Sequence, residues 1–218
     1  MLEVFRELLS LPLGEYDIAR LAYEIEREDC GLAGGKQDQY AASFGGFNFI
    51  EFGANDVVVV NPLRVRRHIV NEFQASTILF STGASRDSAK IINDQIGHIK
   101  SSSSSLDAMH DIKELAYGLK SSLLRGSISD VATRLRGAWE AKKATSKSIS
   151  NPQIEEIEKS VIAAGATSIK VSGAGGGGFV MILVEPELRY KVIETLEKLP
   201  GKIVDFEFTN EGVMSWTK

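Results

Sequence analysis

The sequence has few of the residues that build disulfide-rich or zinc-dependent domains. Cys30 is its only cysteine, so no internal disulfide can form, and we expect a reducing, cytoplasmic compartment. The three histidines show no metal-ligand spacing, which argues against a structural zinc site. No apolar run approaches the roughly 18 residues that a membrane helix needs, and the first residues lack the features of a signal peptide. We therefore expect no membrane partner.

Composition is otherwise ordinary for a globular chain. Of its 218 residues, 43% are hydrophobic and 25% are charged. A chain of this length buries about 70% of its unfolded surface, so it needs neither a metal nor a disulfide for stability. The net charge of −4 argues against a nucleic-acid partner and favours small-molecule chemistry.

Apolar periodicity predicts an α+β chain with two domains. In the first part we expect helices at 1–10 and 17–29, a short helix or connector at 65–73, and strands at 47–52 and 57–60 joined by a turn at 53–56. Further on we expect helices at 86–100, 106–124, 128–144, 151–165 and 186–199, and strands at 76–80, 168–172, 179–184 and 202–208. The serines at 101–105 predict an exposed, mobile linker. A boundary near residue 74 gives domains 1–74 and 75–218, the second ordered as a split βαβ unit.

A glycine cluster near the C-terminus is the most unusual local feature. Gly173 and Gly175–Gly178 occupy five of six positions between two apolar runs. The spacing fits a dinucleotide fingerprint, but that motif needs a helix directly after the glycines. Phe179–Val184 predicts a buried strand instead, so the pattern indicates a strand–turn–strand hairpin. A tight turn without any ligand remains the alternative.

A second constellation places one carboxylate after a glycine-rich bend. Asp38 follows Lys36 and Gln37, and a carboxylate so placed can accept a hydroxyl proton. Lys36 would keep Asp38 ionised and offset charge on a phosphoryl group. The alternative is that Asp38 caps a helix at Gln39–Phe44. The sequence leaves these two interpretations open.

Together these segments resemble the GHMP sugar kinases, in particular those acting on D-glycero-D-manno-heptose 7-phosphate. The resemblance rests on segments spread over nearly the whole chain: Gly34–Tyr40 (GGKQDQY), Phe44–Phe49 (FGGFNF), Asn61–Arg64 (NPLR), Ser81–Arg86 (STGASR), Ala108–His110 (AMH), Asn151-Pro152 and Ser172–Phe179 (SGAGGGGF). It implies a partial ribosomal-protein-S5-like α/β half followed by a ferredoxin-like α+β domain.

The resemblance also implies the chemistry. ATP would phosphorylate the anomeric hydroxyl of a sugar phosphate, with Asp38 as the catalytic base and Lys36 as an electrostatic helper. A glutamate about a dozen residues earlier binds Mg²⁺ in the family, and Glu26 holds that place, with Glu24 and Glu28 as fallbacks. The hairpin at Gly173, Ala174, Gly175, Gly176 and Gly177 would lie against substrate and nucleotide phosphates.

Substrate contacts are expected at two places. Near the base they are Gly34, Gly35, Gln37 and Gln39. The sugar's own phosphate would meet Thr82, Ser85 and Arg86 at the start of a helix, where backbone donors and a guanidinium favour an anion. The alternative is that Ser85 is a plain helix cap and Arg86 is solvated.

One family element is missing from these residues. The proline–glycine–serine-rich loop that cradles the ATP phosphates does not occur, and the first helix has no capping residue. We therefore expect little kinase activity from this chain alone, since phosphoryl transfer depends on phosphate positioning. Exposed sheet edges favour a homo-oligomer. A related hexose or fucose kinase, or a non-catalytic binding or assembly protein, remains the alternative.

Overall fold

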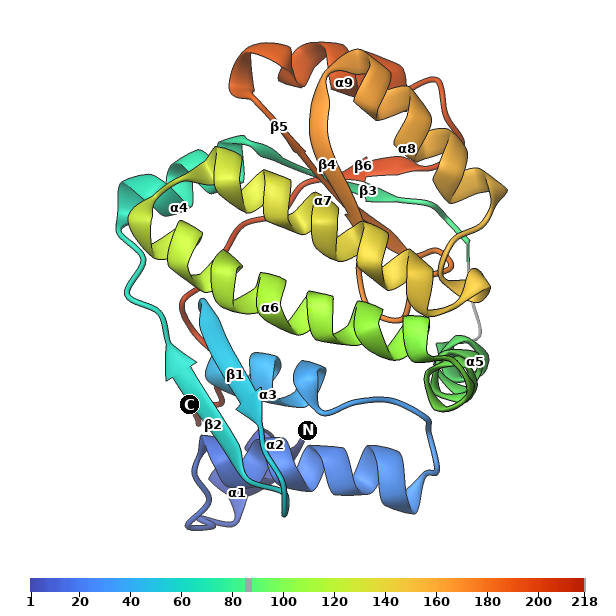
Figure 1. Ribbon diagram of the computed structural model, residues 1–218. Coiled ribbons are helices and arrows are strands. Elements are labelled where there is room, and N and C mark those ends of the chain that lie inside the picture. Colours follow the sequence, from blue (N-terminus) through green and yellow to red (C-terminus); the bar gives the residue numbers. More distant parts are fainter. Residues whose placement is uncertain (85–87, 218) are drawn as a thin grey trace. The chain divides into compact units, whose positions relative to one another are not determined.

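A computed structural model describes residues 1–84 and 88–217 of the chain (Figure 1). Its contacts divide the chain into two compact units, Met1–Arg64 with Phe208–Lys218, and Val65–Glu207. The boundary suggested near residue 74 falls inside the second unit, within helix α4 (Arg67–Ala75). The C-terminal segment belongs to the first unit.

The first unit consists of short helices and a two-stranded sheet. Its elements are α1 (Leu2–Leu8), α2 (Glu15–Tyr23), the π-helix η1 (Glu24–Asp29), α3 (Gln37–Phe44), β1 (Asn48–Phe52) and β2 (Val58–Pro62). β1 and β2 pair antiparallel. Asn55 and Asp56 between them have positive φ angles of 55° and 57°, as a type I′ turn requires. The predicted turn is confirmed.

Aromatic packing joins α2 to α3 in this unit. The Tyr16 ring lies edge-on to Phe44 at 4.8 Å and to Tyr40 at 6.2 Å between ring centroids. The Tyr16 hydroxyl accepts a hydrogen bond from the amide of Val60 in β2, at 2.9 Å. Tyr40, Val60 and Ala19 form the small buried core. Helix α3 is therefore held from two sides.

The C-terminal segment packs onto α3 and α1 without forming a strand. The Gly46 amide donates to the Thr209 carbonyl at 3.0 Å, and the Val213 amide donates to Ala42 at 2.9 Å. A Cβ on Gly45 would lie 2.2 Å from the Glu211 backbone, so glycine permits this approach. The strand predicted at 202–208 is thus wrong beyond residue 204, because the chain leaves the sheet for the first unit.

The second unit contains one sheet and most of the helices. Its elements are α4, β3 (Thr77–Ser81), α5 (Ser88–Ser101), α6 (Ser103–Arg125), α7 (Ile128–Thr145), the 3-10 helix η2 (Lys147–Ile149), α8 (Pro152–Ala164), β4 (Ala166–Val171), β5 (Phe179–Val184), the 3-10 helix η3 (Pro186–Leu188), α9 (Arg189–Leu196) and β6 (Lys202–Val204). Across the described ranges, no helix is long and apolar enough to cross a membrane.

The four strands of this unit form one antiparallel sheet in the order β4-β5-β3-β6. The first and third strands in sequence are central neighbours, and the second and fourth lie at the edges. This is the strand order of a ferredoxin-like split βαβ unit, so the α+β prediction is confirmed. β4 and β5 flank the glycine cluster, which confirms the hairpin and excludes the dinucleotide fold.

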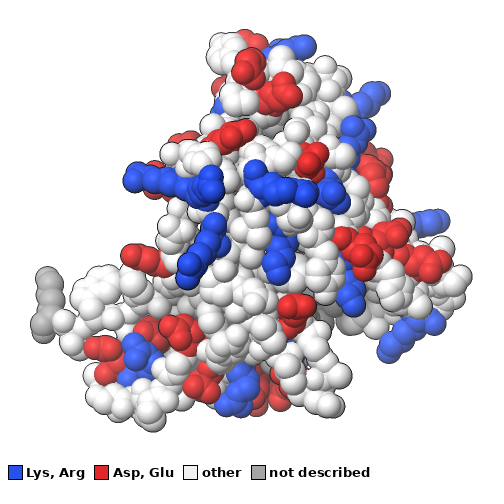
Figure 2. Space-filling model, turned by 60° about the vertical axis from the view of Figure 1, so that its left-hand side comes forward, with Lys and Arg blue, Asp and Glu red and all other residues white. Residues whose placement is uncertain are grey.

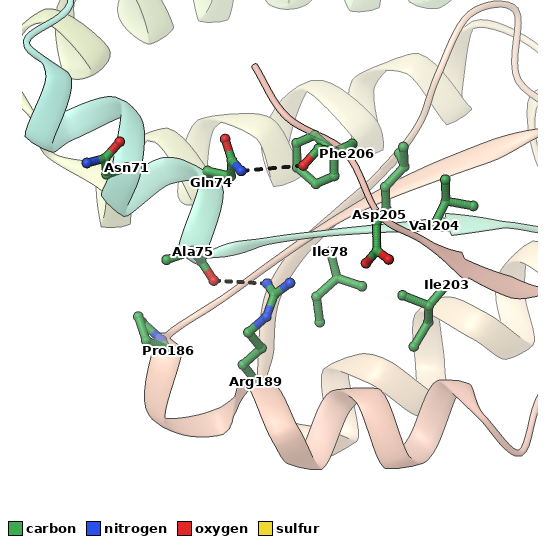
Figure 3. A pocket seen from close by; sticks show the side chains of 11 residues that line it. Asn71, Gln74, Ala75, Ile78, Pro186, Arg189, Ile203, Val204, Asp205 and Phe206 are labelled. Carbon is green, nitrogen blue, oxygen red and sulfur yellow. Dashed lines mark hydrogen bonds between the residues drawn. The ribbon is translucent and has the colours of Figure 1, made fainter. Parts of the chain in front are cut away.

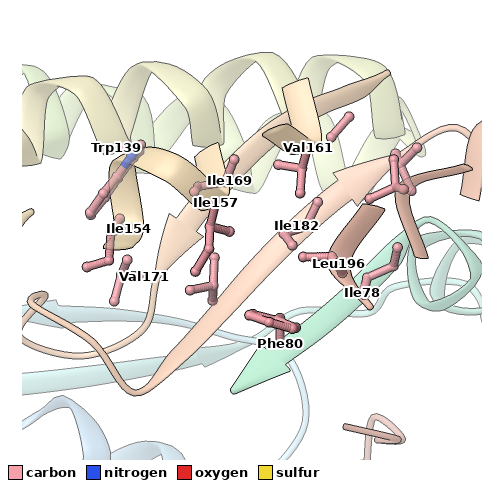
Figure 4. Close-up of a cluster of buried hydrophobic side chains, with 14 of the residues drawn as sticks. Ile78, Phe80, Trp139, Ile154, Ile157, Val161, Ile169, Val171, Ile182 and Leu196 are labelled. Carbon is pink, nitrogen blue, oxygen red and sulfur yellow. The ribbon is translucent and has the colours of Figure 1, made fainter. Parts of the chain in front are cut away.

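The core of the second unit lies between the sheet and its helices (Figure 4). Ile169 and Val171 of β4 point into this cluster, as do Ile157 of α8 and the fully buried Trp139 of α7. Ser168, one residue before Ile169, is also fully buried, so β4 is covered on both faces. α7 is among the helices that pack against β4. Each large apolar side chain buried here contributes roughly 1.5–3 kcal/mol.

The serine tract is not the mobile linker that its composition suggests. α5 continues to Ser101 and α6 begins at Ser103. Ser102 is the N-cap of α6, and its hydroxyl accepts a hydrogen bond from the Ser105 amide at 3.4 Å. Ser105 is buried. Serine is a strong helix cap, so the tract separates two helices with a single residue.

A glycine contact at the start of β6 generates a stability prediction. Gly201 has φ of 146°, and an added Cβ would lie 2.3 Å from the Phe80 ring. Gly201→Ala should lower the free energy of unfolding by about 2–4 kcal/mol, through backbone strain and overpacking. Urea denaturation followed by circular dichroism measures this change.

The matched control for that prediction is Gly97→Ala. Gly97 lies within α5 and an added Cβ would meet nothing within 4 Å. Alanine should stabilise this helix by about 0.5–1 kcal/mol. Equal effects at the two sites would contradict the contact described for Gly201.

Candidate active site

Asp38 lies in the first turn of α3, not at its cap. The helix begins at Gln37 with Lys36 at the N-cap position, so the capping interpretation of Asp38 is wrong. Asp38 is exposed, and no hydrogen bond or ion pair engages its carboxylate in the described part of the chain. A helix N-terminus stabilises a negative charge there. The carboxylate is thus accessible to a ligand.

Lys36 pairs with a residue that sequence reasoning missed. Its Nζ lies 2.5 Å from the Asp56 carboxylate and 4.7 Å from the centre of the Tyr23 ring. The hydrogen bond to Asp56 raises the pKa of Lys36 and lowers the pKa of the Asp56 carboxyl. Within the described residues, no direct contact links Lys36 to Asp38. Twenty residues separate the pair, so no local pattern indicates it.

Glu26 lies in a π-helical turn that the helical pattern does not reveal. The predicted helix 17–29 is α-helical only to Tyr23, and then the Cys30 amide bonds five residues back to Ile25 at 2.9 Å. Such turns are rare and frequently occur at functional sites. The Glu26 Oε2 accepts a hydrogen bond from Gln39 Nε2 at 2.5 Å.

Gln39 is buried, with 7% of its surface exposed. Its amide nitrogen is used on Glu26, and its Oε1 has no partner among the described residues. The side chain therefore faces the protein and fixes the Glu26 carboxylate. The exposed Gln37, at the first position of α3, is the more accessible of the two glutamines.

Arg27 explains one of the glycines before α3. Its Nη1 lies 3.4 Å from each of the carbonyl oxygens of Leu32 and Ala33, and 3.6 Å from Glu26 Oε1. A Cβ on Gly34 would come within 2.3 Å of the guanidinium. Glycine at 34 thus makes room for Arg27 under the loop, a role that no sequence signal indicates.

The acidic residues near α3 can be tested as magnesium ligands. The described residues contain no cluster of three or more His, Cys, Asp or Glu that could hold a metal by itself. Mg²⁺, however, is usually bound by one or two carboxylates together with substrate phosphates. A single oriented carboxylate such as Glu26 fits that pattern. Glu24 is paired with Arg20 at 2.8 Å, and Glu28 is exposed.

The glycine hairpin is shaped by close packing inside the second unit. Gly173 and Gly175–Gly178 all have positive φ, between 68° and 146°. A Cβ on Gly175 would lie 2.8 Å from the Ile149 carbonyl oxygen, and one on Gly176 would lie 2.5 Å from Ile91. The Gly176 amide donates to the Ile149 carbonyl at 2.8 Å. Several of these glycines are therefore required by the fold itself.

Thr82 holds the end of the same hairpin. It is buried, and its Oγ1 accepts hydrogen bonds from the Gly178 amide at 3.0 Å and the Ala84 amide at 3.3 Å. Its own amide donates to the Gly178 carbonyl at 2.8 Å. Ser85 and Arg86, the other residues expected to bind the sugar phosphate, lie outside the described residues. The structure therefore brings Thr82 to the hairpin.

A cavity of about 490 Å³ lies beside β3 and β6 (Figure 3). Arg189 lines it and donates from Nη1 to the carbonyl oxygens of Ala75 at 2.9 Å and Thr77 at 2.6 Å. Burial lowers the pKa of Arg189. None of the residues that the sequence singles out lines this cavity, so it is not the expected site.

Charge is mixed over the face of the molecule in Figure 2. Lys and Arg side chains gather near the middle, and Asp and Glu lie among and around them. Neither sign covers the face as drawn. A broad basic surface, as in many nucleic-acid-binding proteins, is therefore not a feature of the described residues on this face.

Comparison with protein families matches two consecutive domains. The GHMP kinases N terminal domain matches residues 1–46, and the GHMP kinases C terminal domain matches residues 119–201. The first match contains the loop and helix with Asp38. The second contains the glycine hairpin and its flanking strands.

Individual relatives agree with this assignment. D-glycero-alpha-D-manno-heptose 7-phosphate kinase of Campylobacter jejuni is 48% identical over 216 residues, covering 99% of this chain and 63% of the relative. A crystal structure of a D-glycero-D-manno-heptose 1-phosphate kinase from Bacteroides thetaiotaomicron has a TM-score of 0.77 at 40% identity, covering 100% of this chain and 60% of that one.

A more distant relative belongs to a fucose enzyme. L-fucokinase/L-fucose-1-P guanylyltransferase of Bacteroides fragilis is 25% identical over 189 residues, covering 82% of this chain and 20% of the relative. The chain thus spans less than two thirds of the length of each of these relatives. With both domain models matched in order, the chain belongs to the GHMP kinase family.

Proposed function

We propose that this chain takes part in the ATP-dependent phosphorylation of D-glycero-D-manno-heptose 7-phosphate at its anomeric hydroxyl, giving the 1,7-bisphosphate. The observation that carries the proposal is 48% identity to a heptose 7-phosphate kinase over 99% of the chain. The partners would be ATP and a small sugar phosphate. Such metabolites favour a cytoplasmic location.

Asp38 is proposed as the catalytic base. Its carboxylate would accept the proton of the anomeric hydroxyl while that oxygen bonds to the γ-phosphorus of ATP and the bond to the leaving ADP breaks. The exposure of Asp38, its lack of an ion pair among the described residues and its place in the first turn of α3 support this role. Lys36 remains the proposed electrostatic helper. Its pKa is raised by Asp56, so it stays cationic at neutral pH.

Glu26 is the proposed ligand for Mg²⁺. When bound, the ion would neutralise charge on the β- and γ-phosphates of ATP. The buried Gln39 supports this assignment, because it holds one Glu26 oxygen through a 2.5 Å hydrogen bond. Gln39 is then a positioning residue. The exposed Gln37 and the main chain at Gly34 and Gly35 stay as proposed substrate contacts.

The second unit would supply the remaining contacts. The main chain at the hairpin, Gly173–Gly177, is proposed to lie against the nucleotide phosphates. Thr82 would act through the hairpin that it holds, since its hydroxyl already accepts two amide hydrogen bonds. Ser85 and Arg86 remain proposed contacts to the sugar phosphate.

Self-association is a further part of the proposal. Apolar side chains of α1 and of the C-terminal segment are largely exposed: Leu8 by 68%, Val4 by 58%, Met214 by 57% and Trp216 by 77%. They line a hollow of about 330 Å³. Such a surface favours contact with another polypeptide.

A fucose kinase is the second candidate function. The relative from Bacteroides fragilis favours it, but at 25% identity against 48% for the heptose kinase. Both sugars would be phosphorylated by the same chemistry, but fucose is a six-carbon deoxy sugar without a phosphate, whereas the heptose carries a phosphate on its seventh carbon. A non-catalytic binding or assembly role would need neither Mg-ATP affinity nor turnover.

The first prediction about function concerns turnover by these 218 residues. The chain alone should show little ATP-dependent phosphorylation, because it does not contain the family's phosphate-cradling loop. A chimera that adds the unmatched part of the Campylobacter jejuni kinase should phosphorylate heptose 7-phosphate, with the product identified by ³¹P NMR.

The sugar used by the chimera separates the candidate functions. Heptose 7-phosphate should be turned over at least ten times faster than L-fucose. Preference for fucose would favour the second candidate. If the chimera phosphorylates neither sugar and calorimetry detects no Mg-ATP binding, the kinase proposal fails.

The second prediction tests the base. In the chimera, Asp38→Asn should lower kcat by 100-fold or more, since a positioned base contributes about 10²–10⁴-fold. The control is Asp29→Asn, which removes an exposed carboxylate at the end of the π-helix. Comparable kcat values for the two variants would exclude Asp38 as the base.

The third prediction tests the metal ligand by binding. Calorimetry should show that Mg²⁺ raises the affinity of the chimera for a non-hydrolysable ATP analogue. Glu26→Gln should reduce this Mg²⁺-dependent gain about 10- to 100-fold, the usual effect of disturbing a metal's surroundings. The exposed Glu28→Gln is the control. An undiminished gain in Glu26→Gln would rule out the assignment.

A further inference from the structure

The carbonyl groups of the glycine hairpin are held by two side chains from outside it. Asn151 Nδ2 donates to the Gly176 carbonyl oxygen at 2.8 Å. The Lys142 ammonium donates to the carbonyl oxygen of Gly173. Asn151 is the N-cap of α8 and Lys142 lies in the last turn of α7, so two helix ends meet the loop.

Unlike these two carbonyl groups, most amide groups of the hairpin have no partner among the described residues. Gly176 donates to the Ile149 carbonyl and Gly178 to Thr82 Oγ1. Within the described ranges, the remaining N–H groups of the loop find no acceptor: those of Gly173, Ala174, Gly175 and Gly177. Gly175 and Gly177 are nevertheless buried residues. Buried main-chain donors are almost always paired, so the amides of Gly175 and Gly177 require an acceptor from a ligand or water, while Gly173 is exposed and Ala174 is half-buried.

The two features are connected by peptide geometry. In a planar trans peptide, the carbonyl of one residue and the amide of the next point in opposite directions. No cis peptide occurs in the described residues. Holding the Gly173 carbonyl therefore aims the Ala174 amide away from Lys142. Holding the Gly176 carbonyl likewise aims the Gly177 amide away from Asn151.

We propose that Asn151 and Lys142 are positioning residues that orient the hairpin amides for an anionic phosphate oxygen. Successive main-chain N–H groups form concave anion sites, and glycine lets an oxygen approach the backbone. The inference rests on the proposed function for the identity of the anion, a nucleotide phosphate. It goes beyond that function in naming the side chains that set the loop.

Asn151 has two separable roles. Its Oδ1 accepts from the Ile154 amide at 3.0 Å and caps α8, while its Nδ2 holds Gly176. Serine caps helices about as well as asparagine but is shorter and has no amide donor. Asn151→Ser should therefore keep the cap and lose the loop bond. Asn151→Ala should lose both.

The experiment uses the full chain labelled with ¹⁵N and inorganic tripolyphosphate as the probe. In the wild type, titration should shift the amide resonances of Ala174 and Gly177. Asn151→Ser and Lys142→Met should each weaken the affinity read from these resonances at least tenfold. Before any probe is added, both variants should already displace the same resonances.

Two controls separate loop positioning from charge and from folding. Lys147→Met removes a nearby exposed charge from η2 that makes no bond to the loop, and it should change the affinity less than threefold. The thermal midpoint of Asn151→Ser should stay close to that of the wild type, whereas Asn151→Ala should melt earlier.

The outcomes decide the inference independently of the kinase assay. Wild-type affinity in both Asn151→Ser and Lys142→Met, or no shift of the hairpin amides in the wild type, would overturn it. Tripolyphosphate binding needs neither heptose nor turnover. Weakened tripolyphosphate binding in the variants, together with a chimera that neither phosphorylates a sugar nor binds Mg-ATP, would therefore retain the inference and reject the proposed function.

Discussion

The approach of the glycine hairpin to the backbone of Ile149 is the constraint on which the second unit depends. The Gly176 amide donates to the Ile149 carbonyl oxygen at 2.8 Å. A Cβ on Gly175 would also lie 2.8 Å from that oxygen. The loop can lie this close only because side chains are absent and φ is positive. The contact joins the β4–β5 turn to the connection between α7 and α8. Lys142 lies in α7 and Asn151 caps α8, so the same two helices pack in the core and hold the loop.

In the first unit, side-chain contacts hold the residues around Asp38 in place. The Asp38 carboxylate has no hydrogen-bond or ion-pair partner in the part of the chain that the structure describes, while the residues around it are paired: Lys36 with Asp56, and Glu26 with Gln39. Gly34 contributes by leaving space for Arg27 under the loop. In both units the groups proposed to act in the site are therefore held by contacts within the same unit. Such preorganisation avoids the cost of ordering the groups when substrate binds.

Local sequence patterns predicted the features that depend on neighbouring residues, such as turns and helix ends. The apolar runs on both sides of the glycines indicated the hairpin, and the helix expected at 151–165 is α8, with Asn151 as its N-cap. The strand order of the sheet followed from element order. Composition misled only at the serine tract, where a single cap, Ser102, separates two helices.

Contacts between distant residues could not be predicted in the same way. Lys36 and Asp56 are twenty residues apart in the sequence. The Gly178 amide and the Thr82 hydroxyl that it bonds are separated by 96 residues. The end of β6 at Val204 is set by the departure of the chain toward the first unit, a tertiary effect that β propensity does not encode. The roles of Asp38 and Glu26 rest on the family resemblance, since their geometry alone fits more than one function.

The glycine cluster combines close packing in the second unit with main-chain amides that the proposed anion site would use. Its five glycines satisfy packing against Ile149 and Ile91 as well as any role toward a ligand. Packing alone would favour pairing every amide inside the loop, yet four N–H groups remain without an acceptor in the described residues. Of these four residues Gly175 and Gly177 are buried, and leaving a buried donor unpaired costs roughly 1–3 kcal/mol. Open amides beside carbonyls that are held in place are what the proposed anion-binding loop needs, and a turn that serves packing alone needs neither feature.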